Sequence, residues 1–312
     1  MAIYNNERLI IKASKMFYNQ NLSQKDISEA LGISKPQICR MLAYARERQL
    51  IKITISDRYD KEFALENELK NKYGLKEVHV FAIEQNGITN KDVFAQNCAS
   101  VLDKYFLDNI NFGVMSGKTN AAIANFVSRQ TREGMQFIPL VGSFGSSGND
   151  FHANNIARVF AANAGGTYSL LSAPILVKSS SSCEILRAEP FIADVLSMGK
   201  KSNIALVGIG EIGMESTSYK SGAYSIEDIK SLHKEGVIGT ICCSYFDKNG
   251  KFISTELNER TIGVRMQDLS NCLTITCTEK TSNIQLIDAG LKTGSIKIFM
   301  TNVDVASALL KL

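Results

Sequence analysis

The sequence predicts a small all-α segment followed by a larger α/β domain. Residues 1–58 hold ten Lys and Arg against five Asp and Glu, a net charge of +5, whereas the remaining residues hold 25 against 26. From about Lys76 onward, apolar runs of strand length alternate with amphipathic segments of helix length. This alternation is typical of a doubly wound parallel sheet with helices on both faces.

Length and composition indicate a soluble globular chain. A length of 312 residues is enough for two domains. No apolar run is long enough to cross a bilayer, and MAIYNNERLI at the start lacks the apolar centre of a secretory signal. The seven cysteines form no C-x-x-C pair, and the three histidines are far apart. We therefore expect a protein of the reducing cytoplasm without a membrane segment, metal site or cofactor.

Residues 22–53, LSQKDISEALGISKPQICRMLAYARERQLIKI, predict a helix-turn-helix inside a DNA-binding domain of residues 1–56. Gly32 supplies the turn, Ser34 can cap the second helix, and Pro36 suits its first turn. In this motif the N-terminal end of the second helix enters the major groove. The alternative is a helical hairpin with chance surface charges. The residues that we expect to contact double-stranded operator DNA are Gln24, Ser34, Lys35, Gln37, Cys39 and Arg40.

Residues 57–75, DRYDKEFALENELKNKYGL, predict a helical linker. Its apolar residues Phe63, Leu65 and Leu69 favour packing between subunits.

The α/β domain is expected to cover residues 76–312. Its predicted strands are 79–83, 111–115, 137–142, 204–210, 237–246, 273–277 and 297–301. Its predicted helices lie near 91–107, 118–130, 151–164, 184–199, 282–292 and 303–311.

Small residues follow three of the predicted strands, in SGKT (116–119), GSFG (142–145) and GIGEIG (208–213). In parallel sheets, ligands bind at the carboxyl ends of the strands, where small residues let a ligand approach the backbone. The sequence therefore favours a pocket at this edge. The alternative is that the glycines only make turns.

The stretch NFGVMSGKTN (111–120) resembles a nucleotide-binding loop but fails its spacing. Gly113 and Gly117 are separated by three residues, one fewer than in G-x-x-x-x-G-K-[ST]. A magnesium-binding Asp is also missing from the later strand, which ends in glycines and Glu211. Two interpretations remain: anion binding at the start of a helix, and a plain turn from strand to helix.

Several segments together resemble the SorC family of sugar-responsive bacterial transcriptional regulators. They are LGISKPQICRML (31–42), GVMSGKTN (113–120), PLVGSFG (139–145), LVGIG (206–210), FDKNG (246–250), NERTIGV (258–264) and IKIFMTNVDVASALL (296–310). The resemblance implies an N-terminal helix-turn-helix and a sugar-binding domain similar in fold to sugar-phosphate isomerases and deaminases. It also implies a homo-oligomer, from dimer to tetramer, whose affinity for DNA a sugar or sugar phosphate controls.

The same resemblance implies which residues bind the effector. They are Ser116, Gly117, Lys118, Thr119, Gly142, Ser143, Phe144, Asp247, Lys280 and Asn283.

Three positions in or next to the expected effector site differ from the residues usual in the family. Ser116 stands where tryptophan is common. Asn283 stands where a phosphate-binding lysine is usual, and Lys280 lies three residues earlier. Val141 stands where some members carry a lysine that bonds the sugar covalently, which excludes a Schiff base at this position.

The leading hypothesis is a DNA-binding regulator, a repressor of a carbohydrate-utilisation operon, with no catalytic residue. The alternative is an isomerase- or deaminase-like enzyme, which needs a general acid or base. Asp247 and Glu211 are the only carboxylates that we nominate for that role, and the sequence indicates no accompanying histidine.

Overall fold

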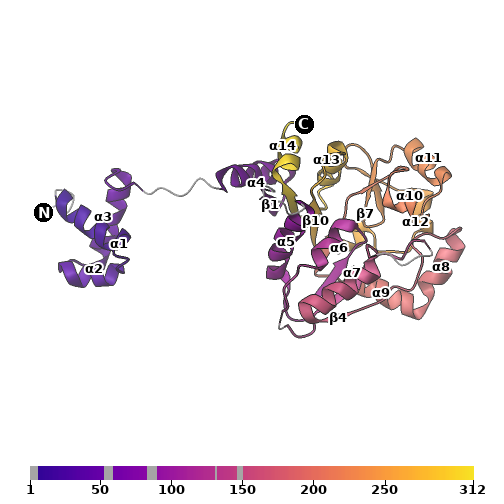
Figure 1. Cartoon of the computed structure of the whole chain (residues 1–312), viewed down its shortest axis with the longest axis horizontal. Helices are drawn as coiled ribbons and strands as arrows, with labels where there is room; N and C mark the ends of the chain where they lie inside the picture. The colour runs from indigo at the N-terminus through magenta and orange to yellow at the C-terminus, as the bar shows by residue number, and fades with distance from the viewer. Residues whose placement is uncertain (1–5, 53–58, 83–89, 131, 146–149) are drawn as a thin grey trace. The chain divides into compact units, whose positions relative to one another are not determined.

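The computed structural model describes residues 6–52, 59–82, 90–130, 132–145 and 150–312. The chain divides into two compact units, Met1–Tyr59 and Asp60–Leu312, both drawn in Figure 1. No helix of the described part is long and apolar enough to cross a membrane. The boundaries predicted above, 1–56, 57–75 and 76–312, stay predictions.

The smaller unit packs three helices around one core. They are α1 (Glu7–Tyr18), α2 (Gln24–Leu31) and α3 (Lys35–Glu47). Ile10, Ile27 and Ile38, one from each helix, are fully buried together. Ser23 and Asp26 form a capping box at the start of α2, and Gly32 ends that helix with a φ of 63°, a conformation that glycine adopts at little cost.

The larger unit is built on a parallel sheet with the strand order β1-β11-β10-β5-β2-β3-β4. Six predicted strand ranges overlap strands of this sheet, although residue 83 falls outside the described residues and residue 210 belongs to a second sheet. The bounds are β1 (Glu77–Phe81), β2 (Asn111–Val114), β3 (Gln136–Pro139), β4 (Thr167–Tyr168), β5 (Ile204–Val207), β10 (Leu273–Thr278) and β11 (Ile298–Asn302).

Helices cover both faces of this sheet, which confirms the α/β class. On β5, Ile204 and Leu206 pack with α5, α6 and α7, whereas Ala205 and Val207 pack with α4, α9, α13 and α14. Figure 1 shows α5, α6 and α7 apart from α13 and α14. The bounds are α4 (Asp60–Tyr73), α5 (Asn90–Leu102), α6 (Lys118–Ala124), α7 (Ala153–Phe160), α9 (Pro190–Lys200), α13 (Ile284–Lys292) and α14 (Val303–Leu310).

Helix α4, predicted as a linker, packs on its own chain. Leu69 is fully buried in the sheet core, and the Tyr73 hydroxyl donates to Asp288 Oδ1 of α13 at 2.8 Å. Packing of its exposed face between subunits stays a prediction.

The helix predicted at 184–199 is wrong as a single element. It breaks at Pro190 into α8 (Ser180–Ala188) and α9. Glu189 is extended, with φ −60° and ψ 127°, because a proline ring disfavours helical geometry in the preceding residue. The helix predicted at 118–130 also ends early, at Ala124.

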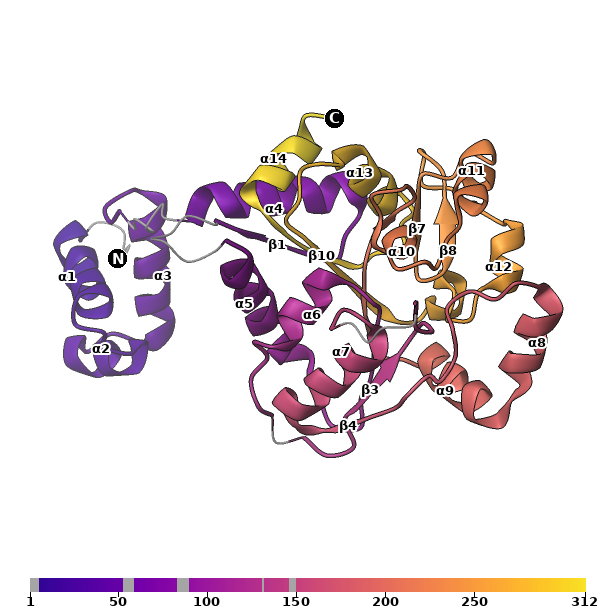
Figure 2. The same cartoon turned by 45° about the vertical axis from the view of Figure 1, so that its right-hand side comes forward.

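The strand predicted at 237–246 is wrong, because this segment folds as a hairpin in a second, antiparallel sheet. Cys242 and Cys243, with φ of 45° and 54°, turn the chain between β7 and β8. This sheet comprises β6 (Gly210–Glu211), β7 (Gly239–Ile241), β8 (Ser244–Phe246) and β9 (Phe252–Ile253). Figure 2 shows β7 and β8 among α10 (Thr217–Lys220), α11 (Ile226–Lys234) and α12 (Glu256–Arg260).

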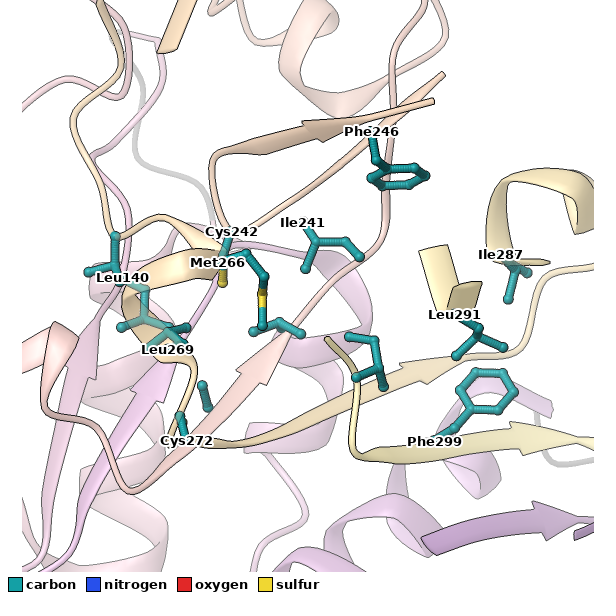
Figure 3. Close-up of a cluster of buried hydrophobic side chains, with 14 of the residues drawn as sticks. Leu140, Ile241, Cys242, Phe246, Met266, Leu269, Cys272, Ile287, Leu291 and Phe299 are labelled. Atoms are coloured by element: carbon teal, nitrogen blue, oxygen red, sulfur yellow. The ribbon is translucent and has the colours of Figure 1, made fainter. Parts of the chain in front are cut away.

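One apolar cluster joins the two sheets. Ile241 and Cys242 of the hairpin lie in it with Met266, and so do Leu291 of α13 and Phe299 of β11 (Figure 3). The hairpin is therefore fixed to the core of the larger sheet.

A charged cluster stabilises the edge strand β1. Glu77 Oε2 accepts from Lys104 Nζ at 2.7 Å, from the Tyr105 hydroxyl at 2.9 Å and from His79 Nε2 at 3.3 Å. Burial alone would raise the pKa of the Glu77 carboxyl, but these hydrogen bonds outweigh it and lower the pKa to about 2.

Glu77→Gln should therefore reduce stability in a pH-dependent way. Near neutral pH we expect a loss of about 1 kcal/mol in the free energy of unfolding, since the cluster is partly exposed. A carboxyl with a lowered folded pKa stabilises fully above its ordinary value of 4.5, and the effect fades as pH falls towards 2. Urea unfolding from pH 7 to pH 3 measures the difference. Glu184→Gln on the exposed face of α8 is the control, and an equal loss there would contradict the assignment.

Candidate functional site

The topology of the larger sheet creates a crevice between β2 and β5. From β2 the chain continues outward to β3 and β4, whereas β5 leads to β10 and β11 on the other side. Connections that leave in opposite directions open a crevice at the carboxyl ends of the strands, where α/β proteins bind ligands. A cavity of about 330 Å³ lies there, lined by residues following β2, β5 and β10.

The first wall is the loop from β2 to α6. Met115 to Asn120 line the cavity. Two hydrogen bonds tie this loop to the segment that starts α7: Ser116 Oγ accepts from the N–H of Ala153 at 3.1 Å, and the Gly117 N–H donates to the Phe151 carbonyl at 2.9 Å. Because the His152 side chain makes no capping hydrogen bond, Ser116 supplies an acceptor at the start of α7.

The opposite wall joins β6 to α13. Gly208 to Glu211 line it from one side, and Asn283 and Leu286 from the other. Asn283 Oδ1 accepts from the Leu286 N–H at 3.3 Å and caps α13, while its Nδ2 donates to Glu211 Oε1 at 3.1 Å. The mouth thus carries a carboxylate held by the amide that caps a helix.

The floor of the cavity is uncharged. It includes Val141, Cys242, Cys243 and Thr276, each at most 7% exposed. Burial raises the pKa of the Cys243 thiol to about 12, partly offset by Arg187, so the thiol stays protonated near neutral pH. This floor suits the neutral part of a ligand.

Seven of the ten effector residues predicted from the sequence line this cavity. They are Ser116, Gly117, Lys118, Thr119, Phe144, Lys280 and Asn283.

The other three, Gly142, Ser143 and Asp247, are not among its lining residues, and their part in effector binding stays a prediction. A side chain at Gly142 would come within 2.6 Å of the Pro174 backbone, so this glycine serves close packing. Ser143 lines an adjoining hollow of about 460 Å³ instead. Asp247 Oδ1 accepts from the N–H groups of Asn249 and Lys251, both at 2.9 Å, and so holds the turn between β8 and β9.

Several residues that line the cavity were not among the predicted effector residues. Cys242 and Cys243 lie inside the range that the apolar pattern predicted as one strand, so the pattern gave no sign of a turn there. Thr240 and Thr276 lie within strands. Thr240 differs from the residue usual in the family at that position, and no signal marks Thr276. Glu211 was singled out only as a carboxylate near the expected pocket.

The expected DNA-contacting residues gather at the start of α2 and α3. Ser34, Lys35, Cys39 and Arg40 are exposed, and Gln24 is half-buried. Gln37 is also half-buried, and its Oε1 accepts from the backbone N–H and the hydroxyl of Ser34 at 3.2 and 3.0 Å. That side chain therefore holds the helix cap, which leaves its amide N–H groups for other partners.

Fold and cavity define the larger unit as a small-molecule-binding α/β domain, and comparison with known proteins assigns its family. The sugar-binding domain family Sugar-bind matches residues 57–311. The chain is 30% identical over 266 residues to the deoxyribonucleoside regulator of Bacillus subtilis, covering 84% of each protein. It is 26% identical over 269 residues to the sorbitol operon regulator of Klebsiella pneumoniae, again covering 84% of each.

Solved structures of transcriptional regulators have the same fold as this chain. A DeoR family transcriptional regulator from Listeria monocytogenes matches with a TM-score of 0.72 at 26% identity, over 80% of this chain and 99% of that one. The full-length sorbitol operon regulator SorC of Klebsiella pneumoniae has the same fold, with a TM-score of 0.74 at 24% identity over 98% and 99% of the two chains. The chain belongs to the Sugar-bind family, and with it to the SorC-type transcriptional regulators, as the resemblance indicated.

Ser116→Ala should weaken the first wall. Removing the acceptor for the Ala153 N–H leaves that group unpaired, at a cost of about 1 kcal/mol in the free energy of unfolding. Denaturant unfolding of the two proteins measures the loss. Thr119→Ala in the same loop is the matched control, because the Thr119 hydroxyl makes no hydrogen bond within the described residues. If both substitutions cost the same, Ser116 does not support α7.

Proposed function

We propose that the chain is a DNA-binding transcriptional regulator whose affinity for its operator is controlled by a small sugar or sugar phosphate bound in the cavity. The observation that carries the proposal is the cavity at the crevice between β2 and β5, in a chain whose family is one of sugar-binding domains. The curated relatives named above are regulators of deoxyribonucleoside and sorbitol genes.

The smaller unit supplies the DNA-binding surface in this proposal. Its α2, the turn at Gly32 and α3 have the order of a helix-turn-helix, and the chain up to residue 58 carries the net charge of +5. Exposed Lys35 and Arg40 lie at the N-terminal part of α3, which reads base edges in this motif. Arg pairs well with guanine, and Lys with guanine or phosphate.

The cavity supplies the effector site. Hydroxyl groups of Ser116, Thr119 and Thr276 line it together with the Glu211 carboxylate and the exposed ammonium groups of Lys118 and Lys280. Such groups match the hydroxyls of a carbohydrate. An effector that prefers one arrangement of a dimer or tetramer by about 1–3 kcal/mol would change DNA affinity roughly 5- to 150-fold. Repression of a carbohydrate-utilisation operon is the regulation that we propose.

An isomerase or deaminase is less well supported. Catalysis of that kind needs a positioned acid or base. Asp247 is not among the residues that line the cavity, and Glu211 is held there by Asn283. No histidine lines the cavity among the described residues.

Arg40→Ala should weaken operator binding without changing sugar binding. Loss of a side chain that pairs with a base edge costs about 1–3 kcal/mol, or roughly 5- to 150-fold in affinity. Titration of labelled operator DNA gives the first quantity, and the sugar-induced rise in melting temperature gives the second. Lys12→Ala, an exposed cation on α1, is the control. An equal loss of DNA and sugar binding in Arg40→Ala would refute the division of labour between the units.

Incubation with fructose 6-phosphate or glucosamine 6-phosphate should give no product. The reason is that the described residues lining the cavity include no histidine to form an acid–base pair with Glu211. Release of ammonia and interconversion of the sugar phosphates are the readouts, with a known deaminase as the positive control. Turnover that disappears in Glu211→Gln would establish the enzyme instead.

A further inference from the structure

The cavity contains a carboxylate where it faces the start of a helix. Glu211 lies at the end of β6 and accepts from Asn283 Nδ2 at 3.1 Å. Asn283 in turn caps α13 through the Leu286 N–H. The N-terminal end of a helix attracts negative charge. At α13 a carboxylate of the chain itself already lies beside the residue that caps the helix.

Glu211 has capacity left for a ligand. Within the part of the chain that the structure describes, it is in no ion pair. The other lining carboxylate, Glu215, is paired with Lys220. A carboxylate has two oxygens and about four acceptor positions, of which Asn283 uses one. Glu211 can therefore accept hydrogen bonds from two hydroxyls of a bound sugar.

The two lysines that line the cavity, unlike Glu211, are not held by a partner side chain within the described residues. Lys118 follows β2 and Lys280 follows β10, and both side chains are exposed. Neither forms an ion pair within the described residues, so water solvates both ammonium groups. The position of Glu211, in contrast, is fixed by a hydrogen bond to a helix cap. A phosphate at the start of α13 would meet this fixed negative charge, which disfavours it.

We propose that Glu211, positioned by Asn283, selects the effector: its carboxylate binds sugar hydroxyls and excludes a phosphate from the start of α13, so the effector is an unphosphorylated sugar or polyol. This inference rests on the proposed sugar-binding function and names its ligand class. The uncharged floor, formed by Val141, Cys243 and Thr276, is compatible with a neutral molecule whose far end is buried.

The test uses the full-length protein and two kinds of probe. The first is inorganic phosphate, with sulfate at equal ionic strength as the reference. The second is a set of free sugars and polyols, namely erythritol, ribose, glucose and sorbitol, each paired with its monophosphate. A compound that binds only the folded protein raises the midpoint of thermal unfolding. We expect a free compound to stabilise the protein more than its monophosphate does, and phosphate to act no differently from sulfate.

Variants distinguish a specific role of the Glu211 carboxylate from the general effect of removing one negative charge. Glu211→Gln should bind the free compound about tenfold or more weakly, because hydrogen bonds to a charged acceptor are lost. Asn283→Lys should gain stabilisation by phosphate. The control is Glu235→Gln, since Glu235 also accepts one hydrogen bond from a neutral side chain, Ser231, but lies outside the cavity.

The outcomes distinguish this inference from the proposed function. Stronger stabilisation of the wild type by monophosphates, or equal effects of Glu211→Gln and Glu235→Gln, would overturn selection by Glu211 and leave sugar binding intact. If neither the free compounds nor their monophosphates stabilise the protein, that result would count against this inference and against the proposed sugar-binding function.

Discussion

The site depends on one topological constraint, the reversal of strand order between β2 and β5. Segments leaving these neighbouring strands diverge, which opens a crevice at their carboxyl ends. Three loops then approach that space, after β2, β5 and β10. Glycine at position 210 leaves room there, because a Cβ atom would come within 2.9 Å of the Thr240 methyl group on the paired strand β7. The cavity is thus a consequence of chain order, and its lining decides what it can bind.

Two hydrogen-bonded connections keep the walls in place. Ser116 connects the loop after β2 to α7, and Asn283 connects α13 to Glu211 of β6. Both use side chains that also complete a helix end, where backbone N–H groups lack partners within the helix. Residues of the pocket therefore serve structure and recognition together. A substitution in either can change ligand binding through the wall that it supports as well as through a direct contact.

Elements with a strong periodic pattern of apolar residues could be predicted from the sequence alone. The strands of the parallel sheet are apolar because both faces are covered, and their pattern needs no tertiary information. The loop 116–119 was found because glycine and polar residues interrupt that pattern. The hairpin at Cys242 was not found, since two cysteines with positive φ look like strand residues and carry no turn signal. Asp247 was placed in the pocket by resemblance, whereas its contacts belong to a local turn that only the fold reveals.

The Cys242–Cys243 turn combines strained backbone with buried side chains. A non-glycine residue in left-handed conformation costs roughly 1–2 kcal/mol, and glycine would avoid this cost. Glycine would also remove two buried side chains. Cys242 packs with Met266 in the cluster that joins the sheets, and Cys243 packs with Val141 and Ile175 (Figure 3 shows the first of these clusters). Burial of each thiol offsets the backbone strain, so the turn fixes the hairpin to the core of the larger sheet. The same two residues line the cavity, so Cys242 belongs both to the cavity floor and to the cluster that joins the sheets.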